Sequence, residues 1–196
     1  MTLGLDKSQI FESPGTRLSI ASAAFAVDVT LLILGFITTK TDPSDMTVRI
    51  ERYFRLTKQV FDDSNYAFYC NHCDANVKEY SKHCGRCQRC TEKFDHHCIW
   101  LNNCIGYNNY RPFFCTLVFV ILHSLAVIGL GIAHILPITS FQSVFTQIGV
   151  LDIISLIMII LNAIAAAFIG YLLLYHIWLF KVGKTTYQHI LEIRKK

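Results

Sequence analysis

The sequence predicts an all-α membrane protein: a transmembrane helix bundle with three spans and a small cysteine-rich domain in the cytosol. Of its 196 residues, 53% are hydrophobic and only 16% are charged, and the mean hydropathy is +0.38. A soluble domain of this size needs more charged surface. Seven of the eight cysteines fall between Cys70 and Cys104, which sets that segment apart from the apolar remainder.

Three apolar stretches are expected to be the transmembrane helices, at residues 18–38, 112–136 and 150–180. Each is long enough to cross a hydrocarbon core of about 30 Å at about 1.5 Å per residue. Buried helices of a globular protein are the alternative, and the near absence of charge inside the stretches argues against it. The first stretch is too long for a signal peptide and follows a polar lead at residues 1–17.

The basic residues orient the chain in the membrane. Of the 18 lysines and arginines, 11 lie between Lys40 and Arg111 and five follow Phe180, whereas residues 137–149 contain none. By the positive-inside rule, the linker, the cysteine-rich domain and the tail are cytosolic, and the lead and the loop are lumenal. The net charge of +4 therefore suits loops beside anionic lipid and does not indicate nucleic-acid binding. The cytosolic segments are residues 39–68, 69–111 and 181–196.

The cysteine-rich block has the spacing of metal-binding knuckles, in which two residues between thiolates let both sulfurs reach one tetrahedral ion. Because the cytosol is reducing, metal ligation is favoured over disulfides. Two Cys3His sites would leave one cysteine over, and Cys98 is the natural outlier because an aspartate and two histidines precede it. We detect no internal repeat. With its spacing, the block is Cys70-x2-Cys73-x9-His83-Cys84-x2-Cys87-x2-Cys90-x4-Asp95-His96-His97-Cys98-x5-Cys104.

This block resembles the catalytic domain of the DHHC protein S-acyltransferases, or palmitoyltransferases. The match continues through Cys104-x4-Asn109-x3-Phe113. Asp42-Pro43 looks like the family's juxtamembrane Asp-Pro motif, and the segment 184–188 looks like its Thr-Thr-x-Glu motif. The resemblance covers residues from about 18 to 190. It implies two structural zinc ions, one held by Cys70, Cys73, His83 and Cys90 and the other by Cys84, Cys87, His97 and Cys104.

The spare residues suit thioester chemistry. A free thiol of pKa near 8.5 needs a base to ionise at neutral pH. His96 can accept the Cys98 proton and Asp95 can orient the imidazole ring. The resemblance assigns the same roles, with Cys98 taking a fatty acyl group from acyl-CoA and passing it to cysteines of other proteins.

The implied function is protein S-palmitoyltransferase in an endomembrane, either Golgi or endoplasmic reticulum. Its partners are the lipid bilayer, acyl-CoA and cytosolic or membrane-associated proteins with juxtamembrane cysteines, and the helices form a cavity for the acyl chain. Ordinary positive-inside charge is an equally good explanation of each basic residue, and Trp100 could simply anchor at the interface. The expected substrate-binding residues are Lys82, Arg86, Arg89, Trp100, Asn109, Arg111 and Thr186, with Lys93 as a further cation near CoA.

The chain departs from the family pattern in three respects. It has three spans where most members have four, Gln188 stands in place of the Glu of the Thr-Thr-x-Glu motif, and Ile99 stands in place of the common Pro. None of these changes alters the Asp-His-x-Cys set.

Three polar residues fall near the middle of their spans: Asp28, His123 and Asn162. A carboxylate at that depth is unfavourable unless it is paired or faces the bundle interior. One hypothesis is that the three meet and close the bottom of the acyl cavity, and the alternative is that each is satisfied separately. Cys115 is expected to pack within its span and His72 to lie at the surface.

Two other functions would also fit a membrane protein with a cysteine-rich, metal-binding segment. A zinc-binding membrane adaptor would recruit partners without chemistry, and a membrane-anchored ubiquitin-ligase-like module also uses interleaved zinc ligands. The residual nucleophile with its base and aspartate favours the acyltransferase over both.

Overall fold

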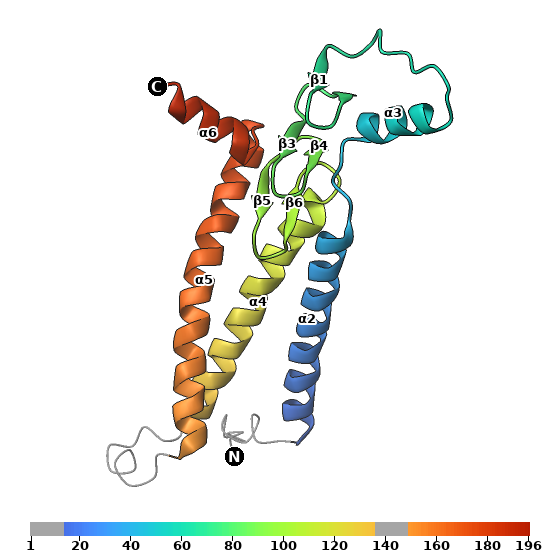
Figure 1. Ribbon diagram of the computed structural model, residues 1–196. Helices are drawn as coiled ribbons and strands as arrows, with labels where there is room; N and C mark the ends of the chain where they lie inside the picture. The colour runs from blue at the N-terminus through green and yellow to red at the C-terminus, as the bar shows by residue number, and fades with distance from the viewer. Residues whose placement is uncertain (1–13, 136–148) are drawn as a thin grey trace, which may run out of the picture. The chain divides into compact units, whose positions relative to one another are not determined.

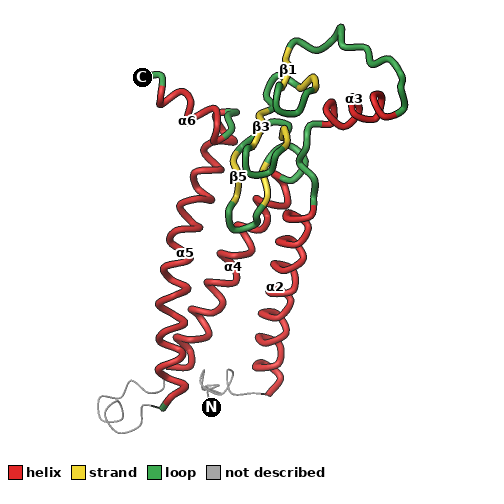
Figure 2. Tube along the Cα trace, in the orientation of Figure 1, coloured by secondary structure: helices red, strands yellow, loops and turns green. Residues whose placement is uncertain are grey.

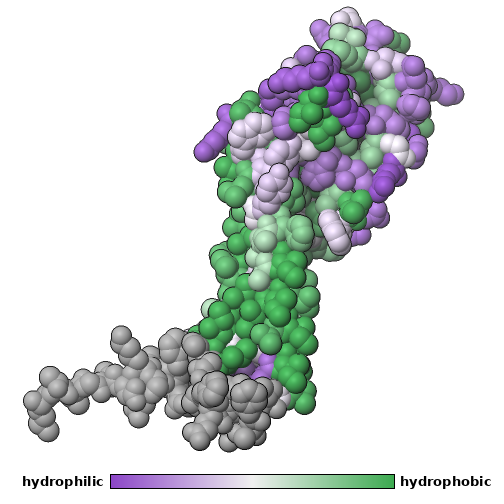
Figure 3. Space-filling view, turned by 90° about the vertical axis from the view of Figure 1, so that its left-hand side faces the viewer, coloured by the Kyte–Doolittle hydropathy of each residue, from purple (hydrophilic) through white to green (hydrophobic). Residues whose placement is uncertain are grey.

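The computed structural model describes residues 14–135 and 149–196. Three long helices dominate it: α2 (Pro14–Lys40), α4 (Tyr110–Ile135) and α5 (Val150–Val182), as Figure 1 shows. By length and composition, each can cross a membrane, and hydrophobic side chains gather over them in Figure 3. The prediction of three long apolar helices is therefore confirmed.

The helix bounds differ slightly from those expected. Helix α2 begins at Pro14 and so includes the end of the expected polar lead. The rest of that lead, and the expected loop up to residue 148, lie outside the described residues. The described residues form two compact units, one of residues 14–33, 117–135 and 149–171 and one of residues 34–116 and 172–196.

The cysteine-rich segment consists of three antiparallel two-stranded hairpins (Figure 2). The predicted all-α class is therefore too narrow. In each hairpin a tight turn with a left-handed residue joins two strands that pair antiparallel. The strands are β1 (Phe68–Cys70), β2 (Ala75–Val77), β3 (Lys82–Cys84), β4 (Arg89–Thr91), β5 (His96–Cys98) and β6 (Asn103–Ile105).

These hairpins are an internal repeat that the sequence did not reveal to us. Strands β1, β3 and β5 begin 14 residues apart, as do β2, β4 and β6. Each turn has a residue with positive φ at the same position: Asp74 (50°), Gln88 (50°) and Asn102 (46°). Asn and Asp tolerate this left-handed conformation well. The regular spacing of Cys70, Cys84 and Cys98 was the available signal.

Two short helices flank the hairpins, and both are capped by side chains. Helix α3 (Met46–Leu56) starts at the buried Asp45, which accepts the Thr47 N–H at 2.8 Å. Helix α6 (Thr186–Arg194) starts with a capping box between Thr185 and Gln188. A glutamine serves this motif as well as a glutamate, so the capping function accommodates the departure at position 188.

Buried asparagines join the last hairpin to the end of α2. The Asn103 amide donates to the carbonyls of Thr39 (2.9 Å) and Thr41 (3.1 Å), which are free acceptors at a helix end. Asn109 is 0% exposed; its amide donates to the Cys104 carbonyl and its oxygen accepts the Gly106 N–H. Asn109 is thus committed to the protein interior, which differs from the expected substrate contact.

The unit that consists of residues 14–33, 117–135 and 149–171 contains the polar residues expected near the middle of the spans. His123 on α4 lies 2.5 Å from the Asp28 carboxylate on α2, so two of the three residues meet. The Asn162 amide instead donates to the Met158 carbonyl of its own helix. The hypothesis of a polar cluster is therefore supported for the Asp28–His123 pair only.

Candidate functional site

The hairpins bring together both expected metal-binding sets. Within each set the potential ligand atoms all lie within 4.8 Å of one another. Strand pairing produces this: His83 lies opposite Cys90 and His97 lies opposite Cys104, while the preceding hairpin supplies a Cys-x2-Cys turn. The two sets are Cys70, Cys73, His83 and Cys90, and Cys84, Cys87, His97 and Cys104.

The chemistry of these sets fits a divalent cation. Burial and the neighbouring cysteine sulfurs raise the pKa of the Cys90 thiol, and burial likewise raises that of Cys104. Burial lowers the pKa of His83 and His97, so both imidazoles are neutral and able to ligate. Crowded sulfurs of this kind become thiolates when a metal supplies the compensating charge, and a closed set of three Cys and one His is typical of structural zinc.

Cys98 occupies the first cysteine position of the third hairpin. The backbone N–H groups of Trp100 and Leu101 point at its sulfur, as those of Arg86 and Cys87 point at Cys84. Leu101 stands where the other turns have their second cysteine. The repeat therefore gives Cys98 a sulfur-binding turn without the second thiolate that would make it a metal ligand.

Asp95 and His96 lie beside this cysteine. The His96 Nδ1 is 2.7 Å from an Asp95 oxygen, and the other Asp95 oxygen accepts the Thr186 backbone N–H at 2.9 Å. Asp95 is only 2% exposed and Cys98 only 8%. The N-terminus of α6 thus supports the carboxylate, which is a favourable place for a negative charge.

The electrostatics favour an ion pair between cysteine and histidine. Burial alone would lower the pKa of His96, but hydrogen bonds with Asp95 and Cys98 outweigh it and raise the pKa to about 9. Burial alone would raise the pKa of Cys98, but its hydrogen bonds with His96 and with backbone N–H groups lower it overall. The pKa of Asp95 is also lowered, because its hydrogen bonds to His96 and Thr186 overcome its burial. This arrangement favours a thiolate beside an imidazolium at neutral pH.

A second histidine, which was not among the expected site residues, lies at this site. His176, near the C-terminal end of α5, is 1% exposed, and its Nδ1 lies 3.0 Å from the Tyr110 hydroxyl. Its ring is 5.9 Å from the His96 ring and 5.2 Å from that of Phe113. Spacing along an apolar helix does not distinguish such a residue from an ordinary core histidine.

The expected substrate-binding cations are distributed over several surfaces. Arg89 forms an ion pair with Asp42 at 3.0 Å and also donates to Asn103, which suits an internal role. Arg86 is exposed. Trp100 is 89% exposed in the hairpin turn beside Cys98.

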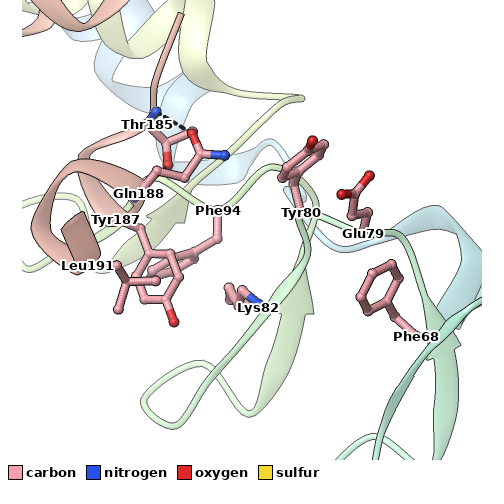
Figure 4. A pocket seen from close by; sticks show the side chains of 9 residues that line it. All are labelled: Phe68, Glu79, Tyr80, Lys82, Phe94, Thr185, Tyr187, Gln188 and Leu191. Carbon is pink, nitrogen blue, oxygen red and sulfur yellow. Dashed lines mark hydrogen bonds between the residues drawn. The ribbon is translucent and has the colours of Figure 1, made fainter. Parts of the chain in front are cut away.

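The other cations line two cavities in the unit that contains the hairpins. One of about 290 Å³ is lined by Lys82, Phe94, Tyr187 and six further residues (Figure 4). The Lys82 ammonium lies 5.9 Å from the centre of the Tyr187 ring. The other cavity, of about 360 Å³, is lined by Lys93, Arg111 and Asp95 among others.

Cys115 and His72 lie outside both the ligand sets and the catalytic set, and the structure agrees with the expectation for only one of them. Cys115 on α4 is exposed, which is contrary to the expected packing within the span. His72 is exposed as expected, and its ring stacks on that of His83 at 4.8 Å.

Comparisons with known proteins agree with this geometry. A family model described as DHHC palmitoyltransferase matches residues 63–193. The chain is 36% identical over 93 residues to "Palmitoyltransferase erf2" of Emericella nidulans (47% of this chain, 16% of the relative) and 33% identical over 118 residues to "Palmitoyltransferase ZDHHC15A" of Danio rerio (60% and 35%). It is 32% identical over 145 residues to "Probable protein S-acyltransferase 20" of Arabidopsis thaliana (67% and 20%). The chain therefore spans about a third or less of the length of these relatives.

Proposed function

Because this chain belongs to the DHHC palmitoyltransferase family, we propose that it is itself a protein S-acyltransferase that acts through an acyl-Cys98 intermediate. The observation that supports this proposal most directly is the hydrogen-bonded series from Thr186 through Asp95 and His96 to Cys98. A nucleophile, a base and a group that orients the base are the parts needed for thioester exchange.

In the first step the Cys98 thiolate attacks the thioester carbonyl of acyl-CoA. A carbon–sulfur bond forms to Cys98, and the bond between the acyl carbon and the CoA sulfur breaks. The His96 imidazolium gives its proton to the departing CoA sulfur, so that CoA leaves as the thiol. Asp95 stabilises that imidazolium beforehand and keeps Nδ1 as the donor, so that Nε2 faces the reacting sulfur.

In the second step a cysteine thiol of a protein substrate gives its proton to His96. The resulting thiolate attacks the acyl group, a new thioester forms, and Cys98 leaves as the thiolate. The two half-reactions together therefore restore the starting pair of Cys98 thiolate and His96 imidazolium. This scheme predicts ping-pong kinetics, because CoA leaves before the acceptor thiol reacts.

The metal sets have a structural role in this proposal. Two zinc ions, one in each Cys3His set, would hold the hairpins in register, and their closed coordination leaves no position for substrate. The metals supply folding energy, while the chemistry falls to Asp95, His96 and Cys98.

The acyl chain is proposed to lie among the spanning helices, in an endomembrane such as the Golgi or endoplasmic reticulum. A sixteen-carbon chain is held by hydrocarbon at about 0.8 kcal/mol per CH₂. The protein substrates would then be cytosolic or membrane-associated proteins with cysteines close to the membrane.

The anionic part of acyl-CoA is assigned to the cytosolic cations. Lys93 and Arg111 line the cavity that reaches Asp95, and Lys82 lines the aromatic cavity beside α6. Trp100 lies in the turn that follows Cys98 and suits the mouth of the acyl site. Replacing Lys93 and Arg111 together with Gln should raise the KM for acyl-CoA and leave the maximal rate nearly unchanged.

A two-stage transfer experiment tests the proposed function. Purified protein in detergent is loaded with labelled palmitoyl-CoA, freed of excess label, and mixed with a membrane-anchored peptide that contains one cysteine. Transfer of the label from the protein to the peptide supports the proposal. A protein that folds with two zinc ions but neither loads nor transfers label would instead be a zinc-binding scaffold.

A further inference from the structure

His176 is a buried polar residue that the proposed chemistry does not use. One of its nitrogens lies within 4.8 Å of the potential ligand atoms of both Asp95 and His96. An imidazole with 1% exposure needs a hydrogen-bond partner, and the Tyr110 hydroxyl supplies one at 3.0 Å. His176 and Tyr110 thus form a hydrogen-bonded pair directly beside the Asp95–His96 pair.

The His96 ring is enclosed by these neighbours. It packs edge-on to Phe113 with ring centres 5.3 Å apart, and it faces His176 at 5.9 Å. Phe113 in turn packs edge-on to His176 at 5.2 Å. The hydrogen bond that His96 donates to Asp95 fixes one edge of the His96 ring, and the two aromatic neighbours restrict rotation of the ring plane about that bond.

Asp95, His96 and His176 could also be a ligand set for a third metal. The hydrogen bonds argue against that assignment. Asp95 already accepts from His96 and from Thr186, and the His176 Nδ1 is engaged with Tyr110. The set is therefore described better as two hydrogen-bonded pairs in contact.

We propose that His176 is a positioning residue for acyl transfer, which together with Tyr110 holds the His96 imidazole in the orientation that reaches the Cys98 sulfur. The inference rests on the proposed function. Productive proton transfer requires the base within about 0.5 Å of its working position, so a residue that limits rotation of the ring acts on the rate and not on substrate affinity.

The test compares variants by the kcat and KM of palmitoyl-CoA in acyl-enzyme formation and transfer. His176→Phe retains an aromatic ring but loses the hydrogen bond, and kcat should fall by about 10- to 100-fold, as for other residues that orient a functional histidine. The KM should stay within about twofold. Tyr110→Phe should lower kcat by less, and the double variant should be no worse than His176→Phe, because the two residues act as one unit.

A matched control lies one residue earlier on α5. The Tyr175 hydroxyl is 2.8 Å from His189 Nδ1, which is another tyrosine–histidine hydrogen bond. Tyr175→Phe should leave kcat unchanged. His176→Asn, whose amide can replace the Nδ1 contact, should recover part of the activity lost in His176→Phe.

The possible results separate the explanations. An unchanged kcat in His176→Phe overturns the inference, as does a rise in KM at constant kcat, or an equal loss in Tyr175→Phe. Three zinc ions per chain in the wild type, with two in His176→Phe, would indicate a metal site instead. If His176→Phe does not fold, Tyr110→Phe, which removes a single oxygen, decides the question by the same criteria. A wild type that never forms an acyl-enzyme overturns the proposed function as well.

Discussion

Replacing Thr186 with Pro should selectively weaken the support of the Asp95 carboxylate. Thr186 is the first residue of α6, a position where proline is well tolerated. Thr185 before it has φ −86° and ψ 160°, which is the extended conformation that a residue before proline adopts. The substitution therefore preserves the helix but deletes the N–H that donates to Asp95 at 2.9 Å.

The size of the effect follows from the burial of the carboxylate. The Asp95 side chain is 1% exposed, so water cannot replace the lost donor. A hydrogen bond to a charged group contributes about 1.5–3 kcal/mol, and about 1.4 kcal/mol corresponds to a tenfold change in rate. Acyl-enzyme formation should slow by about 10- to 100-fold in Thr186→Pro.

The assay is the initial rate of hydroxylamine-labile labelling from palmitoyl-CoA, with zinc content and thermal midpoint as controls for folding. Thr186→Ala is the matched control because it keeps the N–H and loses only the hydroxyl, so its rate should fall by less. A Thr186→Pro protein that is as fast as the wild type, or a Thr186→Ala protein that is equally slow, would refute the reasoning.

Three further predictions follow from other parts of the site. First, Leu101→Cys completes a third Cys-x2-Cys turn with Cys98, so acyl labelling of this variant should be lost in oxidising buffer and recover with reductant and chelator. The control variant Leu101→Ser should be labelled normally. Equal labelling of both variants in every buffer would contradict the described turn geometry. Second, the pKa of Cys98 is lowered and that of His96 is raised to about 9. The labelling rate should therefore rise with pH as the thiol ionises and reach its plateau below the ordinary thiol pKa of about 8.5. A rise whose midpoint lies at or above that pKa would mean that His96 does not assist the thiol. Third, Asp28→Ala removes the hydrogen bond with His123 and should destabilise the protein by about 1 kcal/mol, a typical value for hydrogen bonds between spanning helices; an unchanged thermal midpoint would exclude this contribution.

The sequence predicted the three long apolar helices because their signal is local: an apolar stretch of membrane length has few alternatives. The cysteine spacing favoured metal ligation, whereas the division of the ligands into two sets came from the family resemblance, and the structure brings the same residues together. The assignment of Cys98 as the cysteine outside both sets followed from counting, and the structure adds a reason, since Leu101 occupies the place of the second thiol in its turn.

What the sequence did not predict depends on contacts between distant segments. His176 is 80 residues from His96 along the chain, and only the packing of α5 against the last hairpin brings them together. Thr186 acts through its backbone N–H, a group that every residue except proline has, so the residue type does not indicate this role. Asn109 was expected at the substrate because of its motif, but it is committed to backbone groups in the interior.

The most direct test of the account is autoacylation of the purified wild type beside Cys98→Ser. Both proteins are incubated with labelled palmitoyl-CoA, tested for release of label by neutral hydroxylamine, and assayed for zinc. The account predicts a hydroxylamine-labile label on the wild type, its absence from Cys98→Ser, and equal zinc content in the two proteins. Label that persists in Cys98→Ser, or a folded, zinc-loaded wild type that takes up none, would contradict it.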